Sequence, residues 1–115
     1  MALPQPDRFD PSEGTFTCEL RRRDRAAEIV LGGEVDIAAR SALDDVLREA
    51  LDSEEPDALV VDMTAVTFAD SSTVHWLTEV KRSADAAGAR LTVTTAPGAV
   101  RDLLAITGMK THLSR

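Results

Sequence analysis

The chain has 115 residues, which suits one domain with one core. Its single Trp, three Phe and absent Tyr mean that aliphatic side chains must build that core. A net charge of −7 at pH 7 argues against partners that are themselves negative, namely nucleic acids and anionic membrane surfaces. Cys18 is the only cysteine, which excludes an intramolecular disulfide and favours a small buried apolar residue; two histidines make a structural zinc site implausible.

Residues 1–14 have the composition of a loosely ordered arm. They contain Pro4, Pro6 and Pro11 and no apolar run, so they do not resemble a signal peptide. No stretch of the chain approaches the roughly 20 apolar residues of a membrane-spanning helix. We therefore expect a cytoplasmic protein whose folded domain occupies residues 15–115.

The domain is predicted to open with a hairpin. Residues 15–20 alternate between apolar and polar side chains, as a half-buried strand does. Residues 21–25 are rich in arginine and are interpreted as a solvated turn. Residues 26–31 form the second strand, and Gly32-Gly33 is expected to end it.

The next segment, Gly33-Glu34-Val35-Asp36, is predicted to be a loop whose last residue caps a helix through its carboxylate. Apolar residues then recur at three- and four-residue spacing from Ala39 to Leu51, with charged residues between them. This pattern indicates an amphipathic helix packed on one side, which Pro56 prevents from continuing.

Residues 58–63 are nearly continuously apolar, which is typical of a central strand covered on both faces. Residues 64–69 are predicted to be a connection in which Val66 and Phe68 anchor into the core. A helix is expected to follow from Ser71 or Ser72, with Val74, Leu77, Val80, Ala84 and Ala87 buried, and to stop at Gly88.

The C-terminal part is predicted to hold a strand over residues 90–95, a last helix that begins at Pro97 and ends at Gly108, and a short edge strand within residues 109–115. Strand–helix–strand units require parallel pairing with right-handed crossovers. The predicted fold class is α/β, with a mixed sheet of four to five strands, an N-terminal β-hairpin and three main helices.

Asp70-Ser71-Ser72 stands between a strand and a helix, and two readings of it stay open. The first is a helix N-cap, because Asp and Ser satisfy the free backbone N–H groups of a helix start, worth about 0.5–2 kcal/mol. The second is a phosphoacceptor, since a helix N-terminus tolerates negative charge. A phosphate there would add about −1.5 to −2 charges to whatever surface docks over the turn.

Two other readings fail on their partners. A nucleophilic serine would need a Gly-x-Ser-x-Gly elbow and a base, but the elbow is missing. Only His75 and His112 could act as the base, and His75, three residues after Ser72, cannot readily reach back in line. A phosphorylated Asp62 would need an acidic pair after an early strand to hold Mg²⁺, and residues 29–33 contain none. We therefore expect no enzyme activity, no cofactor and no metal.

Three segments resemble the STAS domain family of bacterial anti-sigma-factor antagonists. Gly-Glu-Val-Asp at 33–36 is similar to the family's loop before the first helix. Residues 60–72 resemble its strand followed by an Asp-Ser-Ser phosphorylation turn, and residues 97–109 resemble its closing helix. The likeness runs from about residue 15 to residue 113, and the middle segment is the most specific.

The resemblance implies a phosphorylation-controlled binding protein in the partner-switching control of stress-response transcription. The unmodified protein would bind an anti-sigma factor that is also a serine kinase, which frees a sigma factor. The kinase would phosphorylate the second serine of the pair, Ser72, with Ser71 and Thr73 as alternatives, and a phosphatase would reset the cycle. The partner-binding residues that we expect are Glu34, Asp36, Asp70, Ser71, Thr73, His75 and Trp76, although His75 and Trp76 depart from the family's pattern.

The family usually has Gly where this chain has Thr73, and a β-branched wall beside Ser72 would narrow partner choice or slow phosphorylation. Trp76 is expected either at the rim of the core or as an exposed anchor for a partner, and His75 either as a solvated residue or as a phosphate sensor. The rival function is an unswitched STAS module, a scaffold or small-ligand binder in which Asp70-Ser71-Ser72 is only a cap.

Overall fold

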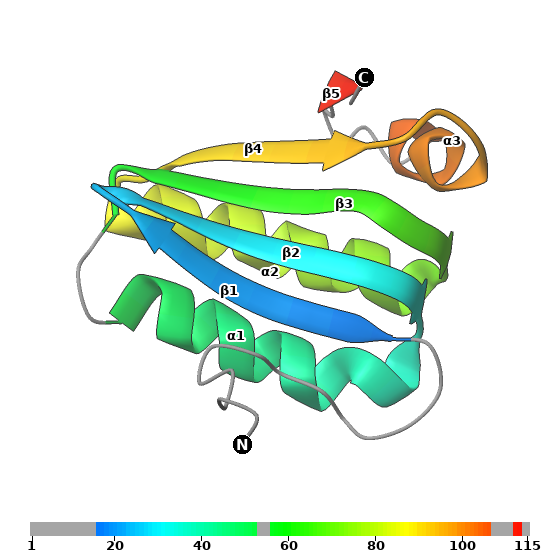
Figure 1. The fold of residues 1–115 in the computed structure, drawn as a ribbon, viewed down its shortest axis with the longest axis horizontal. Helices are drawn as coiled ribbons and strands as arrows, with labels where there is room; N and C mark the ends of the chain where they lie inside the picture. The colour runs from blue at the N-terminus through cyan, green and yellow to red at the C-terminus, as the bar shows by residue number, and fades with distance from the viewer. Residues whose placement is uncertain (1–15, 53–55, 107–111, 114–115) are drawn as a thin grey trace, which may run out of the picture.

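A mixed sheet with strand order β1-β2-β3-β4-β5 forms the centre of the computed structural model, which describes residues 16–52, 56–106 and 112–113 (Figure 1). β1 runs antiparallel to β2, and the other neighbours are parallel. The strands are β1 (Thr17–Arg23), β2 (Ala26–Val35), β3 (Ala58–Ala69), β4 (Arg90–Thr95) and β5 (His112–Leu113). The helical elements are the 3₁₀ turn η1 (Ile37–Ala39), α1 (Arg40–Asp52), α2 (Ser71–Ala87) and α3 (Ala99–Ile106).

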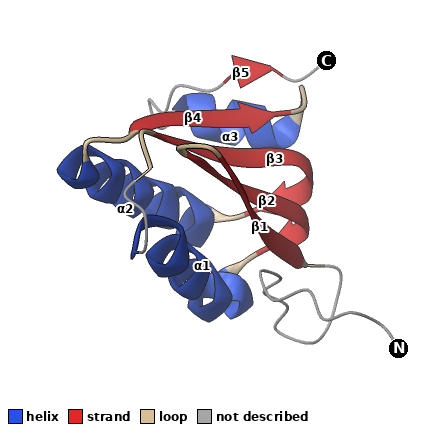
Figure 2. Ribbon diagram, turned by 60° about the vertical axis from the view of Figure 1, so that its left-hand side comes forward, coloured by secondary structure: helices blue, strands red, loops and turns tan. Residues whose placement is uncertain are grey.

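α1 and α2 lie side by side against the same face of the sheet, and α3 lies near the ends of β3 and β4 (Figures 1 and 2). The predicted α/β class, the opening hairpin and the short last strand are confirmed. The predictions for residues 1–14 and for Gly108 lie outside the described residues. Among the described residues, no helix has the length and apolar character needed to cross a bilayer.

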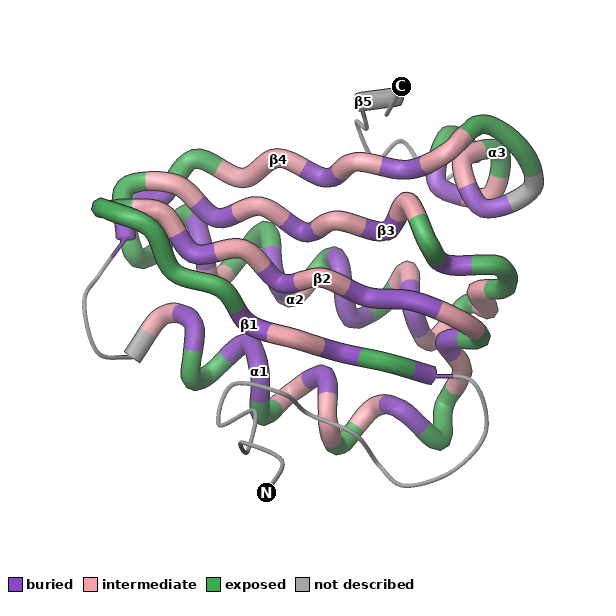
Figure 3. Tube along the Cα trace, in the orientation of Figure 1, coloured by how far each residue is buried: buried purple, intermediate pink, exposed green. Residues whose placement is uncertain are grey.

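The core lies between the sheet and the two helices α1 and α2. Buried and less buried residues alternate along the strands, as Figure 3 shows, because successive side chains of a strand point to opposite faces. β3 contributes Leu59, Val61 and Met63, all at most 1% exposed, and the amphipathic face of α1 packs against the same layer. Each fully buried aliphatic side chain contributes about 1.5–3 kcal/mol.

Two central strands are longer than the sequence indicates. β2 continues through Gly32-Gly33 to Val35, and β3 continues to Ala69, so the predicted strand end and connection are wrong. Pairing between these strands satisfies the backbone groups of both extensions. Gly32 is a close-approach position instead of a stop, since a Cβ there would lie 2.7 Å from Thr17 Oγ1.

The predicted caps of the two long helices are confirmed. The Asp36 carboxylate accepts a hydrogen bond from Ala38 N at 3.0 Å, although it caps the 3₁₀ turn η1, which leads directly into α1. Gly88 ends α2 with a φ of 76°, a left-handed conformation that glycine adopts without strain. A guanidinium ties the two helices together, because Arg40 bonds Asp44 at 3.1 Å on α1 and Glu79 at 2.7 Å on α2.

Cys18 should be inert in the folded protein. It is 0% exposed, and burial, with a smaller contribution from the charge of Glu19, raises the pKa of its thiol to about 12. Because the thiolate is the reactive form, we expect an aromatic disulfide reagent at pH 8 to modify Cys18 slowly in the native protein and rapidly in guanidinium chloride. Fast stoichiometric modification of the native protein would contradict this placement.

Candidate functional site

The first turn of α2 is organised by one carboxylate. Asp70 is the N-cap residue, and its Oδ1 accepts hydrogen bonds from Ser72 N at 3.0 Å, Thr73 N at 3.4 Å and Ser72 Oγ at 2.5 Å. The cap reading of Asp70-Ser71-Ser72 is therefore confirmed. The same carboxylate holds the Ser72 hydroxyl in a defined orientation.

The two serines differ in their surroundings. Ser71 is exposed, whereas Ser72 is half-buried and its hydroxyl donates a hydrogen bond to Asp70. The side chain of His75 is 68% exposed and lies 4.0 Å from a Glu79 oxygen. The turn thus presents one oriented hydroxyl beside a carboxylate at the surface.

Thr73 lies below this surface. It is 0% exposed, and its hydroxyl donates to the backbone oxygen of Val35 at 2.9 Å. The expectation that Thr73 forms a wall beside Ser72, contacts a partner or serves as an alternative phosphoacceptor is therefore wrong in this structure. The reason is geometric: the third residue of α2 faces inward, onto the end of β2.

Trp76 is also in the core. It is 0% exposed, so both the rim position and the exposed partner anchor are wrong. The buried side of α2 is formed by Thr73, Trp76, Leu77, Val80 and Ala84, at helical spacing. Relative to the predicted stripe this face is rotated toward Thr73 and Trp76, which leaves Val74 half-buried and Ala87 exposed.

The ends of β2 and β3 bring the remaining site residues together. β2 and β3 are parallel and in contact, and Val35 pairs with Ala69, immediately before Asp36 and Asp70. Both strands end where α1 and α2 begin, at the right of Figure 1. Glu34 and Ser71 are exposed there, so five of the predicted residues share one edge of the sheet: Glu34, Asp36, Asp70, Ser71 and Ser72. His75 follows one turn along α2.

Sequence reasoning missed two residues at this edge. Phe68 is 50% exposed and Ile37 is 74% exposed, and they are the large hydrophobic side chains that remain exposed among the described residues. The expectation that Phe68 anchors into the core is therefore wrong. A signal for the exposure of Ile37 was present, because this residue precedes the apolar stripe that begins at Ala39. No such signal for Phe68 exists in the pattern of residues 64–69.

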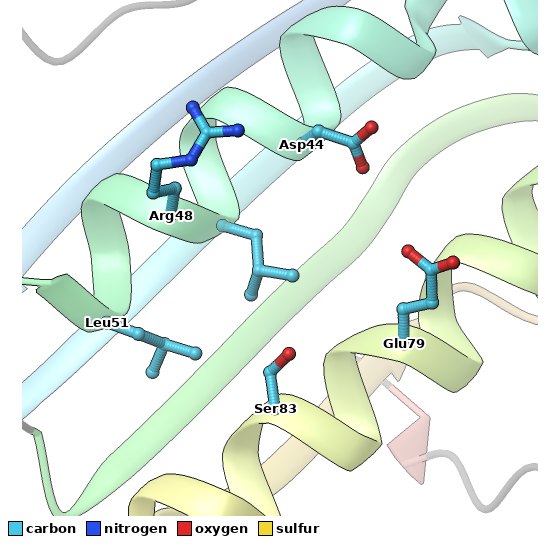
Figure 4. A pocket seen from close by; sticks show the side chains of 6 residues that line it. Asp44, Arg48, Leu51, Glu79 and Ser83 are labelled. Carbon is cyan, nitrogen blue, oxygen red and sulfur yellow. The ribbon is translucent and has the colours of Figure 1, made fainter.

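A groove of about 460 Å³ lies elsewhere, between α1 and α2 (Figure 4). Leu47 and Leu51 line it together with charged and polar side chains from both helices, namely Asp44, Arg48, Glu79 and Ser83. Asp44 and Glu79 are already bonded to Arg40. Small-molecule sites are mostly apolar with few polar groups, and this lining does not fit that description.

A model of a protein family matches most of this chain. The model described as "Mlab, STAS domain" matches residues 18–114, most of the chain. The chain belongs to the STAS domain family. Comparison with the sequences of curated proteins finds no match.

Solved structures agree with this STAS fold. An anti-sigma factor antagonist from Mycobacterium paratuberculosis is 21% identical with a TM-score of 0.74, over 97% of this chain and 90% of that chain. The anti-sigma factor antagonist SpoIIAA in its unphosphorylated form is 20% identical with a TM-score of 0.73, over 85% and 88%. A single-residue variant of RsbS from Moorella thermoacetica is 20% identical with a TM-score of 0.69, over 85% and 87%. At these identities the likeness shows the fold.

The bond from Thr73 to Val35 can be tested by stability. Thr73→Val keeps the shape of the side chain but leaves the Val35 carbonyl without this donor, so we expect the free energy of unfolding in urea to fall by about 1–3 kcal/mol. Thr73→Ser keeps the hydroxyl and should lose about 0.8 kcal/mol for the missing methyl group. A Thr73→Val protein as stable as the wild type would show that the bond does not stabilise the site.

Proposed function

We propose that this STAS domain is an anti-sigma-factor antagonist. In this proposal the unmodified protein binds an anti-sigma factor through the edge where β2 and β3 end and α2 begins, and phosphorylation of Ser72 ends the binding. The anti-sigma factor is itself the serine kinase, and a phosphatase restores the unmodified form. The protein acts in the cytoplasm as a substrate and binding partner, and no catalytic role is assigned to it.

The observation that carries the proposal is the Ser72 hydroxyl, oriented at the start of α2 by Asp70 at 2.5 Å. Family membership and the likeness to two anti-sigma factor antagonists support the same function. Access to Ser72 is not obstructed by Thr73, whose side chain is buried under the turn. The departure from the family's usual Gly is therefore no argument for an unswitched scaffold.

A phosphate on Ser72 would act mainly on the docked partner. The start of a helix favours negative charge by about 0.3–1 kcal/mol, which offsets part of the local cost and leaves the domain folded. At the surface the phosphate adds about −1.5 to −2 charges next to the Asp70 carboxylate. A like-charge or desolvated contact across an interface costs several kcal/mol, enough to release a partner.

Binding of the host's purified anti-sigma factors by calorimetry tests this proposal. Ser72→Ala should bind one of them as tightly as the wild type does. Ser72→Asp should bind it at least tenfold more weakly, because the added carboxylate mimics part of the phosphate charge. Ala86→Asp is the matched control: it adds the same charge at an exposed position near the far end of α2, away from the turn, and should bind as the wild type does.

The modification itself is checked by incubation with that anti-sigma factor and ATP, followed by mass mapping. We expect one phosphate, on Ser72. Phosphate on another residue, or equal affinities for the Ser72→Asp and wild-type proteins, would overturn the proposed switch.

A further inference from the structure

Two large hydrophobic side chains, Ile37 and Phe68, are exposed at the end of the sheet where β2 and β3 finish and the turn that holds Ser72 begins, which we call the Ser72 edge. Ile37 is 74% exposed at the start of η1, and Phe68 is 50% exposed near the end of β3. Single exposed hydrophobic residues are ordinary on protein surfaces. Here, however, the described residues expose both of their large hydrophobic side chains at the same end of the sheet, next to the turn that holds Ser72.

An irregularity in the sheet turns Phe68 outward. Gly33 pairs with Val66, but the next residue of β2, Glu34, pairs with Phe68, so β3 holds one extra residue, Thr67, between the two pairs. In a regular strand Phe68 would share the buried face of Val66, which is 7% exposed. The bulge reverses this alternation and places Phe68 in solvent. Bulges frequently redirect a side chain beside a functional site.

Ile37 is held in place relative to the same turn. It lies two residues after Val35, whose carbonyl accepts the buried Thr73 hydroxyl at 2.9 Å, and directly after Asp36, whose carboxylate caps η1. Thr73 is in turn the neighbour of Ser72. The chain neighbours Val35 and Thr73, joined by this buried hydrogen bond, therefore connect the segment that holds Ile37 to the turn that holds Ser72.

We propose that Ile37 and Phe68 are the apolar anchors of the partner-binding surface, and that the partner protein presents an apolar pocket surrounded by basic side chains. This inference rests on the proposed function and names the contacts that would carry it. The two anchors take the place that sequence reasoning gave to Trp76. Apolar side chains that enter a partner's pocket dominate the energy of such interfaces, and the polar contacts around them exclude water.

The acidic side chains around Ile37 and Phe68 indicate that the partner's surface is basic there. Glu34 is exposed opposite Phe68 in the β2–β3 register, and the carboxylates of Asp36 and Asp70 flank the anchors in sequence. The whole chain carries a net charge of −7. A basic rim on the partner would match these carboxylates and speed association, and a phosphate on Ser72 would be added to a surface that is already acidic.

Affinity for the purified anti-sigma factor that the Ser72→Ala protein binds is the test. We expect Phe68→Ser and Ile37→Ser each to weaken binding at least tenfold, and Phe68→Leu, which stays apolar, to stay within threefold of the wild type. Ala86→Ser, an exposed position near the far end of α2, is the control and should bind as the wild type does. Because the Ile37 side chain is 74% exposed, Ile37→Ser should unfold close to the wild-type temperature. Half of the Phe68 side chain is covered, so Phe68→Ser should lose some stability, and its binding is measured well below its own unfolding temperature and compared with that of Phe68→Leu.

Two outcomes separate this inference from the function on which it rests. If Ser72→Asp weakens binding but Phe68→Ser and Ile37→Ser both stay within threefold of the wild type, the anchors are wrong and the proposed function stands. If Ser72→Asp, Phe68→Ser and Ile37→Ser all bind as the wild type does, both the anchors and the proposed phosphorylation switch are wrong. The basic rim predicts affinity that falls as NaCl rises from about 50 to about 500 mM, and affinity independent of salt would overturn that part.

Discussion

The Asp70 carboxylate is the contact on which the candidate site depends. One oxygen accepts two backbone N–H groups of the first turn of α2 and the hydroxyl of Ser72. The group that starts the helix is therefore also the group that orients the proposed phosphoacceptor. This double use explains why a cap and a switch are not competing readings of Asp70-Ser71-Ser72: the stable helix start is what makes a charge at Ser72 tolerable to the fold.

The position of that turn relative to the rest of the surface depends on the pairing of β2 with β3. Their parallel register puts Val35 beside Ala69. The buried Thr73 hydroxyl then bonds the Val35 carbonyl and so links the first turn of α2 to the end of β2. Thr73 therefore acts as an internal tie. A glycine at this position would have no side chain to make the bond. In this chain the Thr73 hydroxyl therefore ties the start of α2 to the end of β2, which the family's usual glycine cannot do.

Much of the fold could be predicted because it depends on local patterns. The caps at Asp36, Asp70 and Gly88 follow from residue type and position, and α1 follows from a long amphipathic period. The lengths of β2 and β3 could not be predicted in this way, because their last residues are strands only through pairing with each other. Glycines that permit close approach look the same in the sequence as glycines that end a strand.

The helix cap at Asp70 was predicted correctly, whereas the positions expected for Trp76 and Phe68 were wrong. The roles of Ser71 and Ser72 stay predictions. Trp76 and Phe68 exchange the roles expected for them. A small rotation of the buried face of α2, which keeps Leu77, Val80 and Ala84, buries the tryptophan, and a bulge in β3 exposes the phenylalanine. Both effects come from tertiary contacts that no single segment of the sequence records.

An NMR footprint of the bound anti-sigma factor on the ¹⁵N-labelled protein tests the central claim most directly. We expect the amide signals of residues 34–38 and 67–73 to change when the anti-sigma factor is added to the unmodified protein, and the spectrum of the Ser72-phosphorylated protein to stay unchanged on the same addition. A footprint confined to the groove between α1 and α2, or to the β1–β2 turn at the opposite end of the sheet, would contradict it.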